Sequence, residues 1–389
     1  MNHLLIRRLS VGLVLIFSLS LIAVLVPSCT RFNSAAEPYQ IGHLAPRTGP
    51  DQAEGVRLGE AVAQVVEEFN HDEPKGIDGR LITVVHGDSG PDLDGFAYQA
   101  TRLFAINRVS TLIGGVNVSQ LDKLIPPTQT AQAILISPSG GLANPPGKNI
   151  WPIGLHPAER GKYLAKFTVD DLKLTEVAIV VDRSHSIYTA LGDSFKAEFQ
   201  HPERRIRSDW SFRDKEELKA LPAKIAAAEP KAIVFCGKAQ DLLSIISGVR
   251  ENPKTSAIQF LFGGEEEEAV LLNDAKRSQG VIYTTAFTSA DKAEKVQKFC
   301  TDFRSRTGQA PDANAAMSAD AMRIFLAAAR KAQSFKKETL VKELEKLETE
   351  SLTGPFWFGK DQAARRTIYL MRIDGGAAKL QKSFAPEKQ

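Results

Sequence analysis

The feature that most constrains this fold is an alternation, from Tyr39 onward, of short apolar runs with segments of helical period. This order is typical of parallel strands joined by crossover helices, because each strand must be followed by a chain that returns to the edge where it began. Runs that predict strands lie at residues 81–85, 111–113, 133–136, 177–181, 232–235, 259–261 and 281–285. One compact sheet does not take so many strands, so the sequence predicts an α/β protein with more than one sheet.

Segments with the period of a helix separate these runs. Their apolar residues recur at spacings of three and four, which places them on one helix face that lies on a sheet. The clearest face consists of Leu58, Ala61, Val62, Val65, Val66 and Phe69. Two further faces consist of Phe96, Ala100, Leu103 and Phe104, and of Leu242, Ile245, Ile246 and Val249.

The composition fits a folded protein with room for two domains. Of the 389 residues, 43% are hydrophobic and 24% are charged, a balance that excludes disordered and fibrous classes. The 49 basic and 46 acidic residues leave a net charge of only +3, so no nucleic-acid partner is expected. Three cysteines are too few for a disulfide framework.

The amino terminus has the order of an export signal. Arg7 and Arg8 precede an uncharged, mostly apolar run at residues 9–26. The run ends in Val26-Pro27-Ser28-Cys29, which resembles the lipobox of bacterial lipoproteins, where the cysteine is diacylated and becomes the mature amino terminus. We therefore expect Cys29 to carry lipid.

This interpretation divides the first 38 residues into a signal peptide at 1–28 and a polar tether at 29–38. The folded part would then be a membrane-anchored lipoprotein facing the periplasm or the cell exterior. Two other outcomes stay open: the apolar run is long enough to span a bilayer uncut, and Ser34-Ala35-Ala36 suits an ordinary signal peptidase.

Seven short strings stand out along the rest of the chain. They are IGHLAPRTGP (41–50), GIDGR (76–80), IGG (113–115), ISPS (136–139), FGGE (262–265), TGQAPDANAAMSADAMR (307–323) and TGPFWFG (353–359). In this order and spacing they resemble the branched-chain amino-acid-binding (leucine/isoleucine/valine-binding-like) family of substrate-binding proteins of ABC importers. The resemblance covers nearly all of the chain beyond the tether.

The resemblance implies the type I periplasmic binding protein fold, with two Rossmann-like lobes whose parallel sheets are flanked by helices. A three-strand hinge joins the lobes and lets them close on a ligand. Lobe one would take residues 39–155 and 287–352, and lobe two residues 156–286 and 353–389; the proline-rich stretch at 144–157 fits the first passage between them. Cys236 and Cys300 then fall in different lobes, so free, buried thiols are expected.

The resemblance also implies a function. The chain would be an extracytoplasmic receptor that captures a small polar ligand, such as an amino acid or an amide, and delivers it to the membrane permease of an ABC importer. A monomer without a cofactor is expected. The alternative on the same fold is a ligand-sensing or scaffold lipoprotein that transports nothing.

Ligands of such folds lie beyond the carboxyl ends of the strands, where loops lead into helix amino termini. The loops in question are residues 45–54, 115–119, 137–141, 183–188 and 263–266. The candidate ligand-binding residues on them are Arg47, Thr48, Glu54, Asn117, Ser119, Ser139, Gly140, Gly141, Tyr188 and Glu265.

Three loops depart from the amino-acid binders of the family. The hydroxyls that hold the ligand carboxylate there fall on Val118 and Gly141, which have none, and Glu54 replaces an aromatic lid. An acid at that place suits a polar or cationic ligand group. Arg47 suits a ligand carboxylate, although an exposed loop arginine is ordinary.

The other candidates also have structural explanations. Ser119 and Ser139 are suited to capping helices, and Gly140 and Gly141 to close approach of the backbone. In the fifth loop, either Ile187 or Tyr188 takes the place of one aromatic residue of the family.

Glu265 matches the acid that binds the ligand amine in the family, and such a contact has the strength of a charge-assisted hydrogen bond. It begins a run of four acids at 265–268, however, and a run of this kind at a helix start is more often solvated surface.

No catalytic arrangement stands out. The seven histidines have no HExxH pair and no CxxC companion, so no metal site is expected. Ser184-His185-Ser186 lacks the GxSxG sequence of a nucleophile elbow. Residues 141–148 depart from a Walker A loop in spacing, and Asn149 follows where Ser or Thr would bind magnesium. The chain is therefore not expected to be an enzyme.

Overall fold

The computed structural model describes residues 36–141 and 147–388, so the predicted signal segment and Cys29 lie outside the described residues. Contacts divide the chain into two units, and the second, Pro38–Gln389, holds both the fold and the candidate site. In the part of the chain that is described, no helix is both long enough and apolar enough to cross a membrane.

Within the described residues, the first sheet has five strands in the order β2-β1-β3-β4-β5, and all neighbours are parallel. Its strands are β1 (Tyr39–Ala45), β2 (Ile82–Asp88), β3 (Thr111–Gly114), β4 (Ile134–Ser137) and β5 (Ile150–Pro152). The crossover helices are α2 (Gln52–Asp72), α3 (Leu93–Ala105) and α4 (Val118–Thr130). The sequence thus predicts β1 to β4 of this sheet, whereas β5 lies in the stretch at 144–157 that was assigned to the first passage between the lobes.

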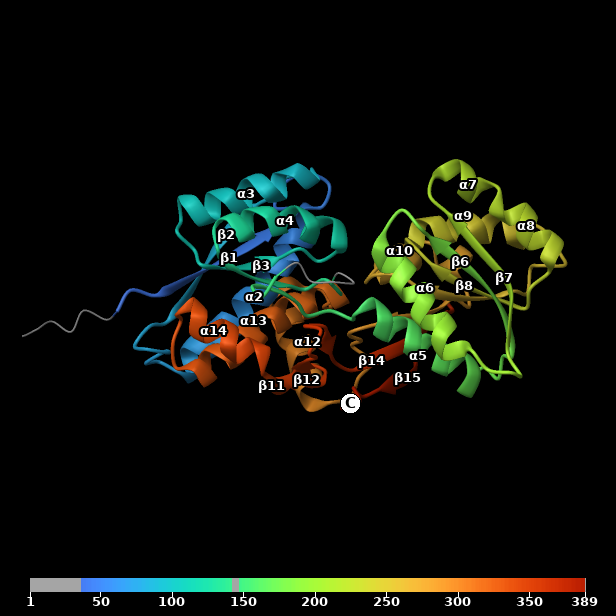
Figure 1. Ribbon diagram of the computed structural model, residues 1–389. Helices are drawn as coiled ribbons and strands as arrows, with labels where there is room; N and C mark the ends of the chain where they lie inside the picture. Colours follow the sequence, from blue (N-terminus) through green and yellow to red (C-terminus); the bar gives the residue numbers. More distant parts are fainter. Residues whose placement is uncertain (1–35, 142–146, 389) are drawn as a thin grey trace, which may run out of the picture. The chain divides into compact units, whose positions relative to one another are not determined.

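Both faces of this sheet are covered, because successive strand residues point to opposite sides. Leu44 and Leu112 pack with α3 and α4, whereas Ile41 and Ile113 belong to the hydrophobic cluster of α2 and α13 (Ala313–Ala332). Figure 1 shows α3 and α4 together on one side of the strands. The apolar face predicted from Leu58 to Phe69 is the buried face of α2.

The second sheet has seven strands in the described part, in the order β15-β14-β10-β9-β8-β6-β7. Five are parallel: β6 (Glu176–Asp182), β7 (Arg205–Phe212), β8 (Ala232–Cys236), β9 (Gln259–Gly263) and β10 (Ile282–Thr285). The hairpin of β14 (Ile368–Asp374) and β15 (Ala377–Phe384) adds two antiparallel strands. Its helices are α5 (Pro157–Asp170), α6 (Ser186–Phe199), α7 (Lys215–Lys219), α8 (Leu221–Ala228), α9 (Ala239–Arg250), α10 (Glu268–Asn273) and α11 (Ala275–Ser278).

A small antiparallel sheet follows the helices that return to the first sheet. It consists of β11 (Glu348–Ser351), β12 (Gly354–Phe358) and β13 (Ala364–Arg365). The helices before it are α12 (Glu294–Thr307), α13 and α14 (Lys337–Glu345). The sequence analysis did not predict this sheet, the edge strand β7 or the β14–β15 hairpin. Strands β7, β11 and β15 are largely exposed and have no continuous apolar run. Strand β14 is buried and begins with the apolar run Ile368–Met371, which the sequence analysis overlooked.

The chain passes from one large sheet to the other in three places. The first passage lies between β5 and α5, and the second between β10 and α12. The third lies at residues 366–367, between β13 and β14, which is later than the predicted boundary at 352/353. That predicted boundary falls in the turn between β11 and β12, two strands of one sheet. The division of the chain into two lobes stays a prediction.

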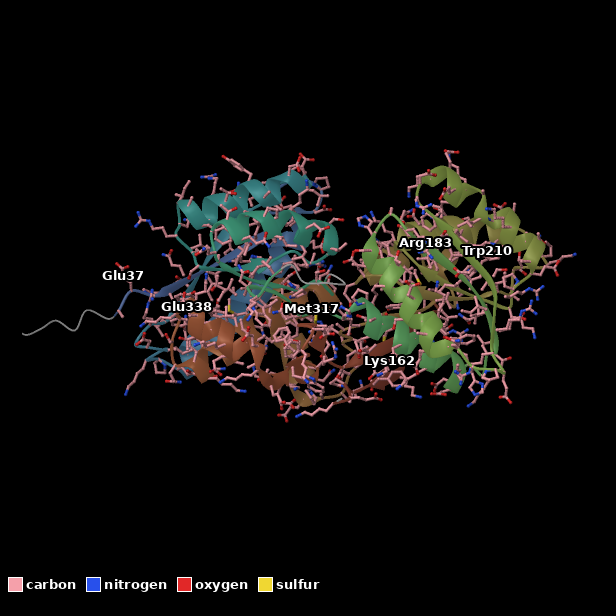
Figure 2. All side chains as sticks on the ribbon, in the orientation of Figure 1. Glu37, Lys162, Arg183, Trp210, Met317 and Glu338 are labelled. Carbon is pink, nitrogen blue, oxygen red and sulfur yellow. The ribbon has the colours of Figure 1, made fainter. Side chains whose placement is uncertain are left out.

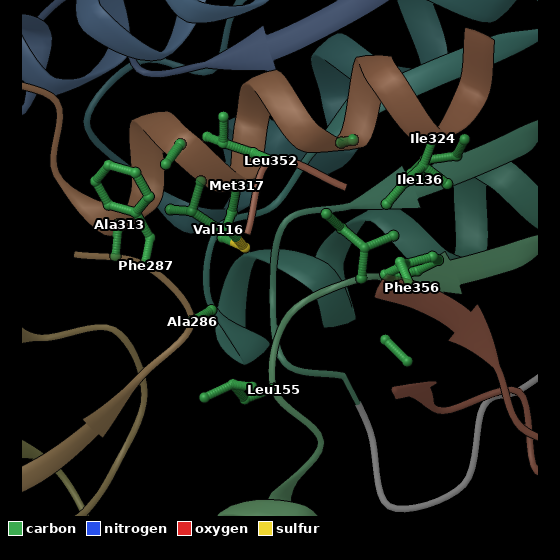
Figure 3. Packing of buried hydrophobic residues seen from close by; sticks show 14 of the residues in the cluster. Val116, Ile136, Leu155, Ala286, Phe287, Ala313, Met317, Ile324, Leu352 and Phe356 are labelled. Atoms are coloured by element: carbon green, nitrogen blue, oxygen red, sulfur yellow. The ribbon is translucent and has the colours of Figure 1, made fainter. Parts of the chain in front are cut away.

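Residues of the first and second passages belong to one hydrophobic cluster. Leu155 and Ala286 are buried in it, together with Leu352 of the β11–β12 turn and Met317 of α13 (Figure 3). Helix α13 is rich in alanine, and 14 of its 20 residues are buried. Small side chains of this kind let the neighbouring elements approach the helix closely.

The surface contrasts with this interior. Figure 2 shows side chains over the whole ribbon, and among those it labels Arg183 and Glu338 are exposed, whereas Met317 is fully buried. Cys236 and Cys300 are both buried and free, as predicted. Burial raises the pKa of the Cys236 thiol, so this thiol stays protonated and unreactive at neutral pH.

A buried ion pair ties two of the passages to α13. Arg366 and Asp320 lie 2.6 Å apart, and both side chains are completely inaccessible to solvent. Arg366 also donates to the carbonyl of Ile153 (2.8 Å) and to the hydroxyl of Thr353 (3.2 Å). Asp320 accepts a further hydrogen bond from the backbone N–H of Leu352 (2.7 Å). The pair thereby fixes the first and third passages against the same helix.

Replacing Asp320 with Asn is expected to lower the free energy of unfolding by about 3–5 kcal/mol, because the charge of Arg366 would stay buried without a counter-charge. Urea unfolding followed by circular dichroism measures this loss. Asp302→Asn is the matched control, because Asp302 pairs with Lys298 at 2.5 Å on the surface of α12. Its loss should be below about 1 kcal/mol. Equal losses for the two variants would contradict the role given to the buried pair.

Candidate functional site

The acidic run at residues 265–268 follows β9 and does not form a freely solvated surface. Glu267 accepts a hydrogen bond from the backbone N–H of Ala239 at 2.9 Å, at the start of α9. Glu268 accepts one from the hydroxyl of Tyr283. All four side chains are partly buried, and each has a specific partner.

Glu265 links the two large sheets. It follows β9 of the seven-stranded sheet, and its carboxylate accepts a hydrogen bond of 2.8 Å from the backbone N–H of Val118. Val118 is the first residue of α4, which packs on the five-stranded sheet. Burial raises the pKa of Glu265 to about 7, although the hydrogen bond from Val118 opposes this rise. The carboxyl group therefore changes its charge near neutral pH.

Glu266 has a different role, because it is bound to the second passage. Its carboxylate pairs with Arg160 at 2.5 Å, and both side chains are less than a tenth exposed. It also accepts from the hydroxyl of Thr285 (2.6 Å) and from the N–H of Ala286 (3.1 Å). Arg160 in turn donates to the carbonyl of Thr284 (3.0 Å). The acidic loop is thus held where the chain leaves the seven-stranded sheet.

A cavity with a volume of about 360 Å³ lies beside this loop. Pockets of a few hundred Å³ are of the size that small-molecule ligands occupy. Five of the predicted site residues line it, namely Glu54, Asn117, Ser119, Tyr188 and Glu265. The other lining residues are Leu93, Val116, Lys238, Glu266, Glu267, Ala269, Val270 and Asn314. The cavity therefore brings together residues from helices of both large sheets.

A second cavity of about 20 Å³ is large enough for a single water molecule. Gly140, Gly141, Ile187, Tyr188 and Glu265 are among the residues that line it. Since Tyr188 and Glu265 line both cavities, these two side chains lie between them.

The sequence left open whether Ile187 or Tyr188 faces the site. Both are buried in the first turn of α6, with exposed fractions of 5% and 1%, and both line the small cavity. Only Tyr188 of the two also lines the large cavity.

Two of the residues that line the large cavity are oriented by hydrogen bonds from helices that pack on the same five-stranded sheet. Glu54 accepts a hydrogen bond from the amide of Asn314 at 3.0 Å, and burial raises the pKa of Glu54. The Asn117 side chain accepts from the N–H of Gln120 at 3.0 Å, so Asn117, and not Ser119, caps α4.

Arg47 and Thr48 line neither cavity. The backbone N–H of Arg47 donates to Asp88 at 2.7 Å, and the Thr48 hydroxyl donates to the same carboxylate at 2.8 Å. The guanidinium of Arg47 lies near Gly59 and His86, where a Cβ on Gly59 would come within 2.9 Å of it. The structure therefore does not bring these two candidates to the other site residues.

Ser139 does not line the cavities either. Its side chain is buried, and its hydroxyl accepts a weak hydrogen bond of 3.4 Å from the N–H of Gly141. A Cβ on Gly140 would lie only 2.3 Å from the carbonyl oxygen of Leu155, so Gly140 permits close approach of the first passage. The contact of Gly140 agrees with the structural explanation given for it, whereas Ser139 follows β4 and caps none of the described helices.

Three residues of the site were missed by the sequence analysis. Asn314 lies in the string TGQAPDANAAMSADAMR, but its partner Glu54 is 260 positions away. Glu267 was treated only as part of the acidic run, and Lys238 carries no motif. Among the described residues, no group of three or more His, Cys, Asp or Glu side chains is arranged to hold a metal ion.

Among protein families, the one described as periplasmic binding protein matches residues 38–378 of the chain. The comparison with curated proteins gives no match. Among solved structures, the chain is similar to the leucine-binding protein LivK of Thermotoga maritima. The TM-score is 0.73 and the identity 19%, over 89% of this chain and 99% of that chain.

Two further structures are similar over most of the chain. One is the branched-chain amino acid transporter substrate-binding protein LivJ of Streptococcus pneumoniae in complex with isoleucine, with a TM-score of 0.72 and 21% identity over 89% of this chain and 98% of that chain. The other is an ABC transporter solute-binding protein of R. palustris in complex with benzoate, with a TM-score of 0.69 and 18% identity over 90% of this chain and 97% of that chain.

The raised pKa of Glu265 predicts how stability depends on pH. The folded protein holds this proton more tightly than the unfolded chain, so the contribution of Glu265 to stability falls as the pH rises from 4.5 to about 7. Glu265→Gln removes the carboxyl group that becomes charged in the fold at pH 8. This substitution should raise the free energy of unfolding at pH 8 by about 1–3 kcal/mol.

Urea unfolding of the wild type and of Glu265→Gln at pH 5 and pH 8 measures the effect. The difference between their free energies of unfolding should be smaller at pH 5 than at pH 8. Glu251→Gln changes an exposed acid in the same way and should alter stability at neither pH. A Glu265→Gln variant that is less stable than the wild type at pH 8 would contradict the burial of an uncompensated charge.

Proposed function

Because the chain belongs to the periplasmic binding protein family, we propose that it is an exported solute receptor that captures a small polar molecule for an ABC-type permease. The ligand would lie in the cavity of about 360 Å³ beside residues 265–268. No step of this function requires a chemical reaction or a cofactor.

The hydrogen bond between Glu265 and Val118 is the observation that carries the proposal. It joins a loop of the seven-stranded sheet to a helix of the five-stranded sheet, at the wall of the cavity. A ligand held there contacts both sides at once, so its binding energy favours the arrangement in which the two sides are close. Such coupling between binding and closure is what a transport receptor needs.

The similar structures support a transport role over a sensor or scaffold role. Two of them are named as substrate- or solute-binding proteins of transporters, and these two hold isoleucine and benzoate. Both are small organic molecules, which agrees with the size of the cavity.

A ligand panel tests this proposal on the purified full-length protein. The panel comprises amino acids, amides, urea, benzoate and small amines, and the readout is the melting temperature. A compound at 100 times its dissociation constant should stabilise the protein by about 2.7 kcal/mol, which raises the melting temperature by several degrees.

Glu265→Gln should abolish the shift produced by any amine-bearing compound, whereas Glu251→Gln on the surface should leave it unchanged. If no compound of a broad panel shifts the melting temperature, the receptor function is refuted.

We also propose that the protein is anchored to the membrane by lipid on Cys29, because the string Val26-Pro27-Ser28-Cys29 ends an apolar export signal. Growth with radioactive palmitate should label the protein, and Cys29→Ala should lose the label. Cys300→Ala is the matched control and should keep it, because that thiol is buried in the fold. Label that persists in the Cys29→Ala variant would contradict the anchor.

A further inference from the structure

The wall of the large cavity carries carboxyl groups on both of its sides. On the side of the five-stranded sheet, Glu54 accepts a hydrogen bond only from the neutral amide of Asn314. On the side of the seven-stranded sheet, Glu265 accepts only from the neutral N–H of Val118. Neither carboxylate is hydrogen-bonded to a basic side chain in the described part of the chain.

Glu267 adds a third carboxylate of the same kind. Its hydrogen bond comes from the backbone N–H of Ala239, and its side chain also lines the cavity. Lys238 is the one basic residue among the described lining residues, and it is exposed to solvent. An exposed ammonium is well solvated, so it compensates buried carboxylates poorly.

The nearest guanidinium groups are already paired. Arg160 is bound to Glu266 at 2.5 Å, and Arg57 is bound to Asp312 at 2.7 Å. Their positive charges are largely balanced by these partners. Three carboxylates therefore face the cavity with too little positive charge in the protein to balance them.

Tyr188 gives an independent indication of a ligand. Its side chain is 1% exposed and lines the cavity, yet within residues 36–141 and 147–388 its hydroxyl makes no hydrogen bond. A hydroxyl without a protein partner at the wall of a cavity can form a hydrogen bond with a bound molecule that has a polar group. The face of its ring also attracts cations.

We propose that the cavity takes a small organic dication with two ammonium groups, one held by Glu54 and the other by Glu265 and Glu267, with its carbon chain packed on Tyr188. This inference rests on the proposed function, because it names the ligand class of the same site. A dication would neutralise carboxylates on both sides of the cavity and so hold the two sides together.

The same geometry disfavours two other kinds of ligand. A zwitterionic amino acid would bring its carboxylate among the three acids, where no unpaired buried cation of the described chain could bind it. A divalent metal ion needs several ligands around one point, and the described residues hold no such group.

Isothermal titration of the full-length protein in detergent tests the ligand class. The probes are 1,4-diaminobutane, 1-aminobutane, leucine, benzoate and calcium chloride. We expect 1,4-diaminobutane to bind at least about tenfold more tightly than 1-aminobutane, because the second ammonium gains a charge-assisted hydrogen bond. Leucine, benzoate and calcium should bind still more weakly.

Two variants locate the two ammonium groups. Glu54→Gln and Glu267→Gln should each weaken the binding of 1,4-diaminobutane at least about tenfold, since each keeps the shape of the side chain but removes its charge. Their thermal unfolding shows that they are folded. Glu251→Gln, a change of the same kind on the surface, should bind as the wild type does.

The outcomes separate this inference from the proposed function. Tighter binding of leucine or benzoate than of 1,4-diaminobutane overturns the dication while leaving the receptor function intact. Calcium that binds tightly and displaces 1,4-diaminobutane overturns it in favour of a metal site. If none of the probes and none of the wider panel binds, both the inference and the proposed function fail.

Discussion

The buried pair of Arg366 and Asp320 is the constraint on which the rest of the structure depends. Taking both charges out of water costs several kcal/mol for each ion, and only a geometry that satisfies their hydrogen bonds recovers this cost. Here the guanidinium needs the carbonyl of Ile153 and the carboxylate needs the N–H of Leu352. Because Arg366 lies in the third passage and Ile153 in the first, few arrangements of the two sheets satisfy these hydrogen bonds.

The pair of Arg160 and Glu266 extends this constraint to the site. Glu266 is bound to the end of β10 and is the neighbour in sequence of Glu265 and Glu267, which line the cavity with it. The positions of those two carboxylates are therefore determined by the passage between the sheets. A ligand that displaces this loop also displaces the second passage, because Arg160 is bound to both. Binding and the relation of the two sides are in this way physically connected.

The sequence predicted what depends on local pattern. Apolar periodicity located most of the parallel strands and the buried face of α2. Position in the family pattern indicated Glu265 and left the choice between Ile187 and Tyr188 open. The sequence could not predict pairings between distant residues: Arg366 lies 213 positions from Ile153, and nothing near it in the chain indicates that partner. Nor does anything near Arg47 in the chain indicate that its backbone N–H donates to Asp88 of another strand.

The most direct test of the central claim is a crystal structure of the protein grown with a compound that raises its melting temperature. The account predicts density in the cavity of about 360 Å³, within hydrogen-bond distance of Glu265 on one side and of Glu54 or Asn117 on the other. Density at any other place, with this cavity occupied only by water, would contradict it.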